Sequence, residues 1–104
     1  LFKDVLEEFG HIDVIINNAG TAILSPLDSE NWVKQWDETM SINLRAVGIL
    51  CNLAIKHFKT RKCGRIINIA SRAAFRGDTA EYLAYAASKA GVVSLSKSIA
   101  RAFG

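Results

Sequence analysis

The sequence predicts an α/β fold built on a parallel sheet. Three segments repeat apolar residues at the spacing of an amphipathic helix, and two β-branched runs, residues 12–16 and 65–70, lie between them. With the two helical stretches between the strands counted as one, the order is helix, strand, helix, strand, helix, in which a right-handed crossover joins parallel strands. Because two strands cannot cover three amphipathic helices, we expect the 104 residues to form only the central part of a doubly wound parallel sheet.

The first two predicted helices lie in the N-terminal half. Apolar residues between 2 and 9 recur at i, i+3, i+4 and i+7, and Gly10 follows at the position of a left-handed C-cap, so we expect a helix that starts before residue 1. Asp28 or Ser29 can serve as the N-cap of a second helix. That helix has three large side chains on one side, Trp32, Trp36 and Met40.

Two more helices are predicted further along the chain. Apolar residues recur at helical spacing from Ile42 to Phe58, which predicts a long amphipathic helix. Asp78, with Glu81 three residues later, fits a capping box for the last helix. The early turns of this helix hold small residues that let another backbone approach closely, namely Ala86, Ala87, Ala90 and Gly91.

Polar residues follow both predicted strands. The run 12–16 predicts a strand buried on both faces, as parallel sheets require, and Asn17, Asn18 and Gly20 end it in a turn. Ser71 ends the second strand. Since open parallel sheets bind ligands beyond the carboxyl ends of their strands, we expect these residues to share one crevice with the start of the last helix.

Composition narrows the class of protein. Half of the residues are hydrophobic and the formal net charge is +3, which is ordinary for a soluble globular protein. No run approaches the roughly 20 apolar residues of a membrane span, and the N-terminal segment does not have the pattern of a secretion signal. We therefore expect no membrane contact and a cytoplasmic location.

The basic cluster, cysteines and histidines predict no further binding chemistry. Residues 59–65 could contact phosphate or nucleic acid, but a solvated helix end that complements the helix dipole is the favoured interpretation, so no nucleic-acid partner is expected. Cys51 and Cys63 lack CxxC spacing and are expected to be reduced thiols. Neither His11 nor His57 has a partner at metal-ligand spacing, so no metal site is expected.

Tyr85 and Lys89 form the most informative pair. They lie one helical turn apart and project from the same face of the last helix. A neighbouring ammonium stabilises a phenolate by about 1 kcal/mol in bulk water, and by several times more in a cleft from which water is partly excluded. The pair therefore suits proton exchange in a cleft, although the spacing can also arise by chance in a helix with a packed Tyr85 and a solvated Lys89. Tyr82 lacks such an ammonium and is expected to line a pocket.

Four motifs occur in order: "NNAG" at 17–20, "SINL" at 41–44, "IINIAS" at 66–71 and "YAASK" at 85–89. Through them the chain resembles the classical short-chain dehydrogenase/reductase family over essentially all 104 residues. The resemblance implies a Rossmann-like domain that binds NAD or NADP and interconverts a secondary alcohol and a ketone by hydride transfer.

The resemblance also implies roles for four catalytic residues. Tyr85 would act as the general acid during reduction and as the base during oxidation. Lys89 would stabilise the phenolate and hold the nicotinamide ribose hydroxyls. Ser71 would bind the substrate oxygen and position it for hydride transfer. Asn43 would lie at an irregularity in the long helix and anchor a water in a proton relay to Lys89.

Cofactor and substrate residues follow from the same resemblance. The cofactor-binding residues would be Asn18, Ala19, Gly20, Tyr85 and Lys89, with Gly20 letting the backbone approach the nucleotide. The substrate pocket would include Arg72, Ala73 and Tyr82. Ser88, inside "YAASK", is expected to be a helix-packing residue rather than a catalyst.

The sequence departs from the family pattern at its ends. The glycine-rich turn of the TGxxxGxG kind and the later strands are absent from the 104 residues, so we expect a single partial NAD(P)-binding domain that carries the catalytic segment. Two functions follow. The residues are the central segment of an oxidoreductase, or they are a non-catalytic remnant that acts as an oligomerisation module.

Several alternatives remain open for the reaction class, the substrate and the oligomeric state. Epimerases and dehydratases of the extended branch share the Tyr and Lys spacing, so they are the second enzyme class. Within the classical branch, reduction of 3-oxoacyl thioesters is the first substrate hypothesis, with sugar alcohols and other secondary alcohols left open. The family resemblance implies a homodimer or homotetramer assembled through the helices near 40–58 and 84–103.

Overall fold

The computed structural model describes residues 1–18 and 20–104 of the chain. Helix α1 and strand β1 come first, and a single long helical segment follows in which a π-helical turn, η1, separates α2 from α3. Strand β2, the short helix α4, the 3₁₀ turn η2 and the long helix α5 complete the chain. Their bounds are α1 Phe2–Phe9, β1 Val14–Asn17, α2 Trp32–Met40, η1 Ser41–Arg45, α3 Ala46–Arg61, β2 Arg65–Asn68, α4 Ala73–Arg76, η2 Ala80–Tyr82 and α5 Leu83–Phe103.

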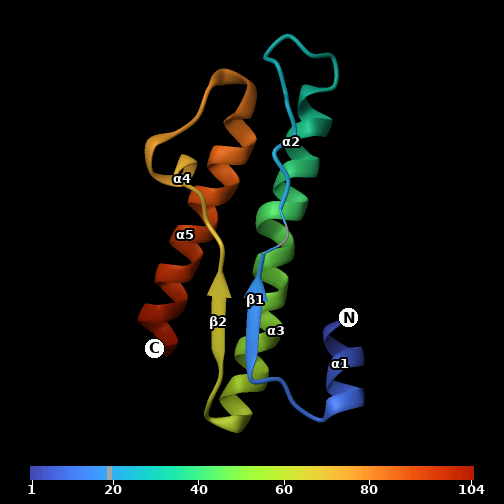
Figure 1. The fold of residues 1–104 in the computed structure, drawn as a ribbon, viewed down its shortest axis with the longest axis vertical. Coiled ribbons are helices and arrows are strands. Elements are labelled where there is room, and N and C mark those ends of the chain that lie inside the picture. The colour runs from blue at the N-terminus through green and yellow to red at the C-terminus, as the bar shows by residue number, and fades with distance from the viewer. Residues whose placement is uncertain (19) are drawn as a thin grey trace.

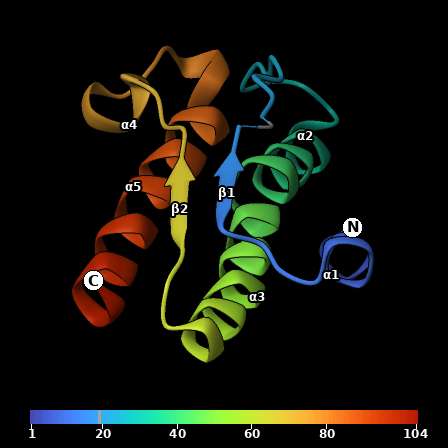
Figure 2. The ribbon, with the colours of Figure 1, turned by 60° about the horizontal axis from the view of Figure 1, so that its bottom comes forward.

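The two strands are parallel, and helices cover one of their faces. Strands β1 and β2 pair in register from Val14 opposite Arg65 to Asn17 opposite Asn68. Helices α3 and α5 run behind this pair, and α1 lies beside α3 (Figures 1 and 2). The ring of Phe2 in α1 contacts His57 in α3 edge-on, with ring centroids 6.2 Å apart. The predicted α/β fold with a parallel sheet is confirmed.

A small apolar core lies between the helices and the sheet. Val47 and Cys51 of α3 and Val92 of α5 are buried at its centre. Partly buried side chains surround them, from η1, β2 and α5: Leu44, Ile66, Leu95 and Ile99. Val47 and Cys51 belong to the apolar helical pattern that predicted a helix from Ile42 to Phe58.

Glycine permits the closest approach between α5 and the π turn. A Cβ placed on Gly91 would lie 2.8 Å from a methyl carbon of Leu44, well inside normal contact. The thin face that the small residues of α5 predict is therefore used, and it lets α5 pack tightly against η1.

Burial of strand β1 on both faces was expected, and this expectation is wrong. Successive strand residues point to opposite faces of a sheet. Val14 and Ile16 remain 48% and 60% exposed, and Ile67 of β2 remains 39% exposed. The reason is that α3 and α5 cover only one face of the two-stranded sheet, so the side chains directed to the other face meet solvent.

Both predicted N-caps are also wrong. Helix α2 begins after Asn31, because Ser29 belongs to a turn in which its N–H donates to the carbonyl of Pro26. No capping box forms between Asp78 and Glu81: the Asp78 carboxylate accepts the N–H of Thr79, and a 3₁₀ turn precedes α5.

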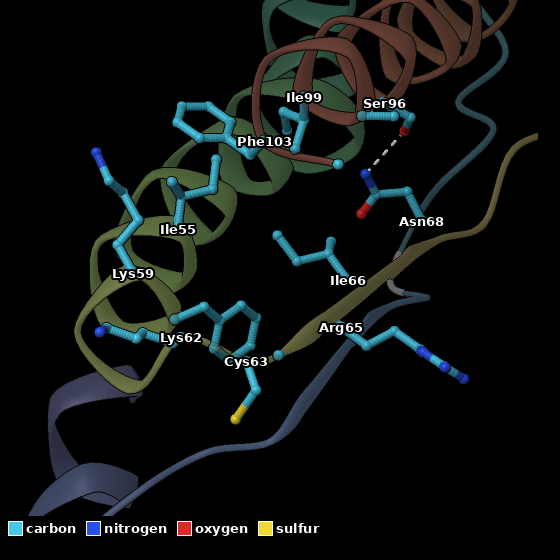
Figure 3. A pocket seen from close by; sticks show the side chains of 14 residues that line it. Ile55, Lys59, Lys62, Cys63, Arg65, Ile66, Asn68, Ser96, Ile99 and Phe103 are labelled. Atoms are coloured by element: carbon cyan, nitrogen blue, oxygen red, sulfur yellow. Dashed lines mark hydrogen bonds between the residues drawn. The ribbon is translucent and has the colours of Figure 1, made fainter.

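A polar network joins the carboxyl ends of the strands to α5. The side-chain NH₂ of Asn17 donates to the amide oxygen of Asn68 at 2.7 Å. The Asn68 NH₂ donates to Ser96 Oγ at 2.9 Å, as Figure 3 shows. The Ser96 hydroxyl donates in turn to the carbonyl of Val92. Burial raises the pKa of the Cys51 thiol beside this network, partly offset by its hydrogen bond with Asn68, so the thiol stays protonated at neutral pH.

Two further sequence expectations concern the cysteines and membrane spans. Cys51 and Cys63 are both free cysteines, the first buried and the second exposed. Within residues 1–18 and 20–104, no helix is long and apolar enough to cross a bilayer.

Candidate active site

A hollow of about 340 Å³ lies at the carboxyl ends of both strands, and α5 forms part of its wall. Residues following β1, residues following β2 and one turn of α5 form its wall. The lining residues are Asn18, Gly20, Thr21, Ala22, Ile69, Ala70, Tyr85 and Lys89. This is where ligands bind in open α/β sheets, as the sequence predicted.

Lys89 is held at the end of β2. Its side chain is only 7% exposed, and its ammonium donates to the carbonyl of Ile69 at 3.3 Å. An ammonium has three hydrogens, so this bond leaves two for other acceptors. Tyr85, one turn earlier on α5, is half-buried and lines the same hollow. The structure therefore brings the Tyr85 and Lys89 side chains to one site.

Gly20 leaves the space that Lys89 occupies. A Cβ at this position would lie 3.1 Å from Nζ of Lys89 and 3.3 Å from Oδ1 of Asn43. Both distances are shorter than ordinary van der Waals contact, so a larger residue would displace the ammonium or the amide. Gly20 thus permits close approach to Lys89 and Asn43, whereas the sequence suggested close approach to a nucleotide.

Asn43 lies in the π turn η1, so the irregularity expected in the long helix is present. Its side chain is fully buried. Oδ1 accepts the backbone N–H of Thr21 at 2.7 Å, and the NH₂ donates to the carbonyl of Thr21 at 2.7 Å and to Ser88 Oγ at 3.1 Å. We call these three residues the Asn43 network. It ties the loop after β1, the π turn and α5 together.

Ser88 is the residue whose contribution the sequence did not reveal. It is fully buried, and its hydroxyl donates to the carbonyl of Tyr85 at 2.8 Å while its oxygen accepts from Asn43. The available signal was a hydroxyl among the small residues in the early turns of α5. Thr21 was missed as well, because it acts through its backbone, which no motif marks.

The remaining predicted residues do not line the hollow or lie outside the described part of the chain. Ser71 follows Ala70, is half-buried, and accepts the backbone N–H of Ala73 at 3.2 Å. Ala73 is buried, Arg72 is exposed and Tyr82 is half-buried. Among the described residues, the hollow's wall includes none of these four. Ala19, predicted to bind cofactor, lies outside the described residues.

A larger hollow of about 670 Å³ lies along β2, between α3 and α5. Figure 3 shows apolar side chains from α3, β2 and α5 around it, including Ile55, Ile66 and Ile99. Lys59 and Arg65 stand at its edge, with the Lys59 ammonium 5.7 Å from the ring centre of Phe103. It contains neither member of the Tyr85 and Lys89 pair, so the smaller hollow is the candidate active site.

A parallel α/β sheet with a tyrosine and a lysine at the carboxyl ends of its strands defines a class of nucleotide-dependent enzyme domains. The chain belongs to the short-chain dehydrogenase family, since the family described as short chain dehydrogenase matches residues 1–104. The family resemblance carried by the four sequence motifs is thereby confirmed.

Named relatives and a solved structure agree with this assignment. The chain is 40% identical over 100 residues to D-threitol dehydrogenase of Mycolicibacterium smegmatis, and 38% identical over 102 residues to 2-dehydro-3-deoxy-D-gluconate 5-dehydrogenase of Escherichia coli. Each match covers 96% of this chain, but 38% and 39% of the respective relative. The solved structure of ElxO with NADP bound superposes with a TM-score of 0.88 at 27% identity, over 98% of this chain and 41% of that one. The chain thus spans about two fifths of the length of these proteins.

The tight packing around Gly20 leads to a first prediction. In Gly20→Ala, the added methyl pushes Nζ of Lys89 by a few tenths of an ångström, so we expect nucleotide affinity to fall about tenfold, the result of losing about one hydrogen bond to a charged group. Gly48→Ala is the matched control, since a Cβ there meets no atom within 4 Å, and it should stabilise the helix by about 0.5–1 kcal/mol. Titration with nucleotide measures the affinity of both variants, and equal affinities for the two would contradict the prediction.

Proposed function

We propose that this chain carries the catalytic segment of an NAD(P)-dependent oxidoreductase that interconverts a secondary alcohol and a ketone. The observation that carries the proposal is the presence of Tyr85 and Lys89 in one hollow at the carboxyl ends of two parallel strands. Family membership and the NADP bound in the similar ElxO structure support it. Residues 1–104 would then form part of a single NAD(P)-binding domain.

The residues present fit a dinucleotide. Gly20 has no side chain where one would collide with Lys89, and the ammonium keeps two hydrogens beyond its bond to Ile69. Ribose hydroxyls are acceptors that such an ammonium can bind. Asn18, Gly20, Tyr85 and Lys89 would hold the cofactor. The nicotinamide supplies or takes the hydride when bound.

Tyr85 would move the proton. In reduction, its phenol gives a proton to the substrate oxygen as the carbonyl carbon receives the hydride, and the O–H bond of the phenol breaks. The phenolate left behind is stabilised by the ammonium of Lys89 at the same site. In oxidation, the phenolate takes the hydroxyl proton instead. The two charges therefore balance within one turn of α5.

Ser71 would position the substrate oxygen. Accepting the N–H of Ala73 uses a lone pair of Ser71 Oγ and not its hydrogen. The hydroxyl can still donate to a carbonyl oxygen. Arg72, Ala73 and Tyr82 would form the neighbouring part of the substrate pocket.

Asn43 would anchor the water of a proton relay to Lys89 by accepting a hydrogen bond from that water. Both hydrogens of its amide are donated, to the Thr21 carbonyl and to Ser88. A water bound here would therefore donate to the second lone pair of Oδ1 or to a main-chain carbonyl of the π turn. Single π turns within α-helices are frequent at functional sites.

The substrate class has two candidates. Reduction of a 3-oxoacyl thioester is the first hypothesis, and oxidation of a sugar-type alcohol is favoured by the names of the two relatives at 40% and 38% identity. The ratio of kcat/KM for a 3-oxoacyl thioester to that for a polyol decides between them.

Replacement of the phenol tests the acid/base role. In the complete protein, Tyr85→Phe removes the transferable proton and keeps the ring, so we expect turnover to fall by at least about a hundredfold while the Kd for nucleotide changes little. Tyr82→Phe removes the same atom from a residue that would border the substrate pocket without lining the hollow, so it should change KM more than kcat. Wild-type turnover by Tyr85→Phe would refute the assignment.

Replacement of the ammonium tests the cofactor role. Lys89→Ala removes the charge that would bind the ribose and stabilise the phenolate, so both turnover and nucleotide affinity should fall. Thermal shifts with NADH and NADPH measure binding and identify the preferred cofactor, because a ligand that binds only the folded state raises its Tm. The exposed Lys97, two turns further along α5, is the control: Lys97→Ala should respond to nucleotide as the wild type does. An unchanged nucleotide response in Lys89→Ala would remove the ribose role.

We also propose that the complete protein is a homo-oligomer assembled through α3 and α5. Ile42, Ile49 and Leu53 are exposed. Their spacing of seven and four residues places them along one side of the continuous helical segment formed by η1 and α3. Ile49→Glu should therefore lower the molecular mass in solution, measured by light scattering. Leu27→Glu, at an exposed apolar residue of the loop before α2, should leave the mass unchanged. A monomeric wild type would refute the proposal.

A further inference from the structure

We propose that Ser88 is a positioning residue that anchors the Asn43 amide to α5 and thereby holds the backbone of Thr21 against the candidate active site. Its effect on nucleotide binding rests on the proposed function. Its hydrogen-bonding role concerns only residues of this chain and can be measured without any nucleotide.

The Ser88 hydroxyl has a fixed direction. Its single hydrogen is donated to the carbonyl of Tyr85 at 2.8 Å, so its oxygen faces Asn43 as an acceptor. The NH₂ of Asn43 lies 3.1 Å from that oxygen. Because Ser88 is on a long helix and Thr21 is in a loop, Ser88 provides the rigid end of the Asn43 network.

Burial makes this anchor hard to replace. Asn43 and Ser88 are both fully buried. Without the Ser88 hydroxyl, one N–H of the amide would lack its partner, and a buried unpaired donor is costly. The amide would then rotate to recover a partner, and each rotation moves the two groups that hold Thr21 by its N–H and its carbonyl.

A shift of Thr21 would change the shape of the hollow in which a nucleotide would bind. Thr21 and its neighbours Gly20 and Ala22 line the wall opposite Lys89. The space there is narrow, since a Cβ on Gly20 would lie only 3.1 Å from the ammonium. A shift of Thr21 by a few tenths of an ångström therefore changes the gap in which a nucleotide would lie.

The chain provides a matched control on the same helix. Ser96 lies eight residues after Ser88, donates its hydroxyl to a helix carbonyl, that of Val92, and accepts from the NH₂ of an asparagine, Asn68. Its chemistry is thus similar, but Asn68 belongs to the separate network that includes Asn17 at the end of β1. Ser96→Ala removes an equivalent hydrogen bond without touching Thr21.

The test compares Ser88→Ala, Ser88→Thr and Ser96→Ala in the complete protein. Amide hydrogen exchange of Thr21 should speed up about tenfold in Ser88→Ala, as expected for losing one buried hydrogen bond, and stay within about twofold in Ser96→Ala. The Kd for the preferred one of NADH and NADPH should rise about tenfold in Ser88→Ala only. Ser88→Thr retains the hydroxyl and should restore both values.

Each outcome decides the role of Ser88. Unchanged exchange of Thr21 in Ser88→Ala, or equal acceleration in Ser96→Ala, overturns the proposal. If the extra methyl prevents Ser88→Thr from folding, the exchange comparison between the two alanine variants decides alone. Absence of nucleotide binding by the wild type would count against the proposed function, while the exchange of Thr21 would still test Ser88.

Discussion

The buried amide of Asn43 is the contact on which the geometry of the candidate site depends. It joins three segments that are distant in sequence, the loop after β1, the π turn and α5, through bonds of 2.7, 2.7 and 3.1 Å. A buried amide is costly unless its donors and acceptor are paired, so the three segments must stay in one arrangement for it to be satisfied. Gly91 favours this arrangement, because a Cβ there would lie 2.8 Å from a methyl carbon of Leu44 in η1, which would then have to move. Packing and hydrogen bonding therefore select the same position for α5.

The parts of the fold that follow from local pattern could be predicted from the sequence. The apolar periodicity from Ile42 to Phe58 predicted α3, and the four-residue spacing of Tyr85 and Lys89 predicted a pair on one face of α5. The helix starts could not be predicted, because they depend on distant partners. The carbonyl of Glu81, for example, accepts the N–H and hydroxyl of Ser25, 56 residues away, and a 3₁₀ turn forms there in place of a capping box.

The candidate site shows the same division between local and tertiary information. Gly20 and Lys89 belong to sequence motifs, and the structure shows that a Cβ on Gly20 would crowd the ammonium of Lys89. Ser88 and Thr21 carry none that distinguishes them, since a serine on a packed face can be simply a small residue. Only the direction of its hydrogen bonds separates a positioning hydroxyl from packing. The extent of strand burial likewise depended on how many faces the helices cover, which periodicity does not report.

Helix α5 is held by two similar contacts, and their separation restrains the turn that carries Tyr85 and Lys89. Ser88 accepts from Asn43, and Ser96 accepts from Asn68. Eight residues correspond to about 12 Å along the helix axis and to about 80° around it after two full turns. Two contacts at different heights and different angles restrain both sliding and rotation of a helix, which one contact cannot do. Tyr85 and Lys89 lie on either side of the first contact, so the direction of the phenol and the ammonium into the hollow is set where the restraint is strongest.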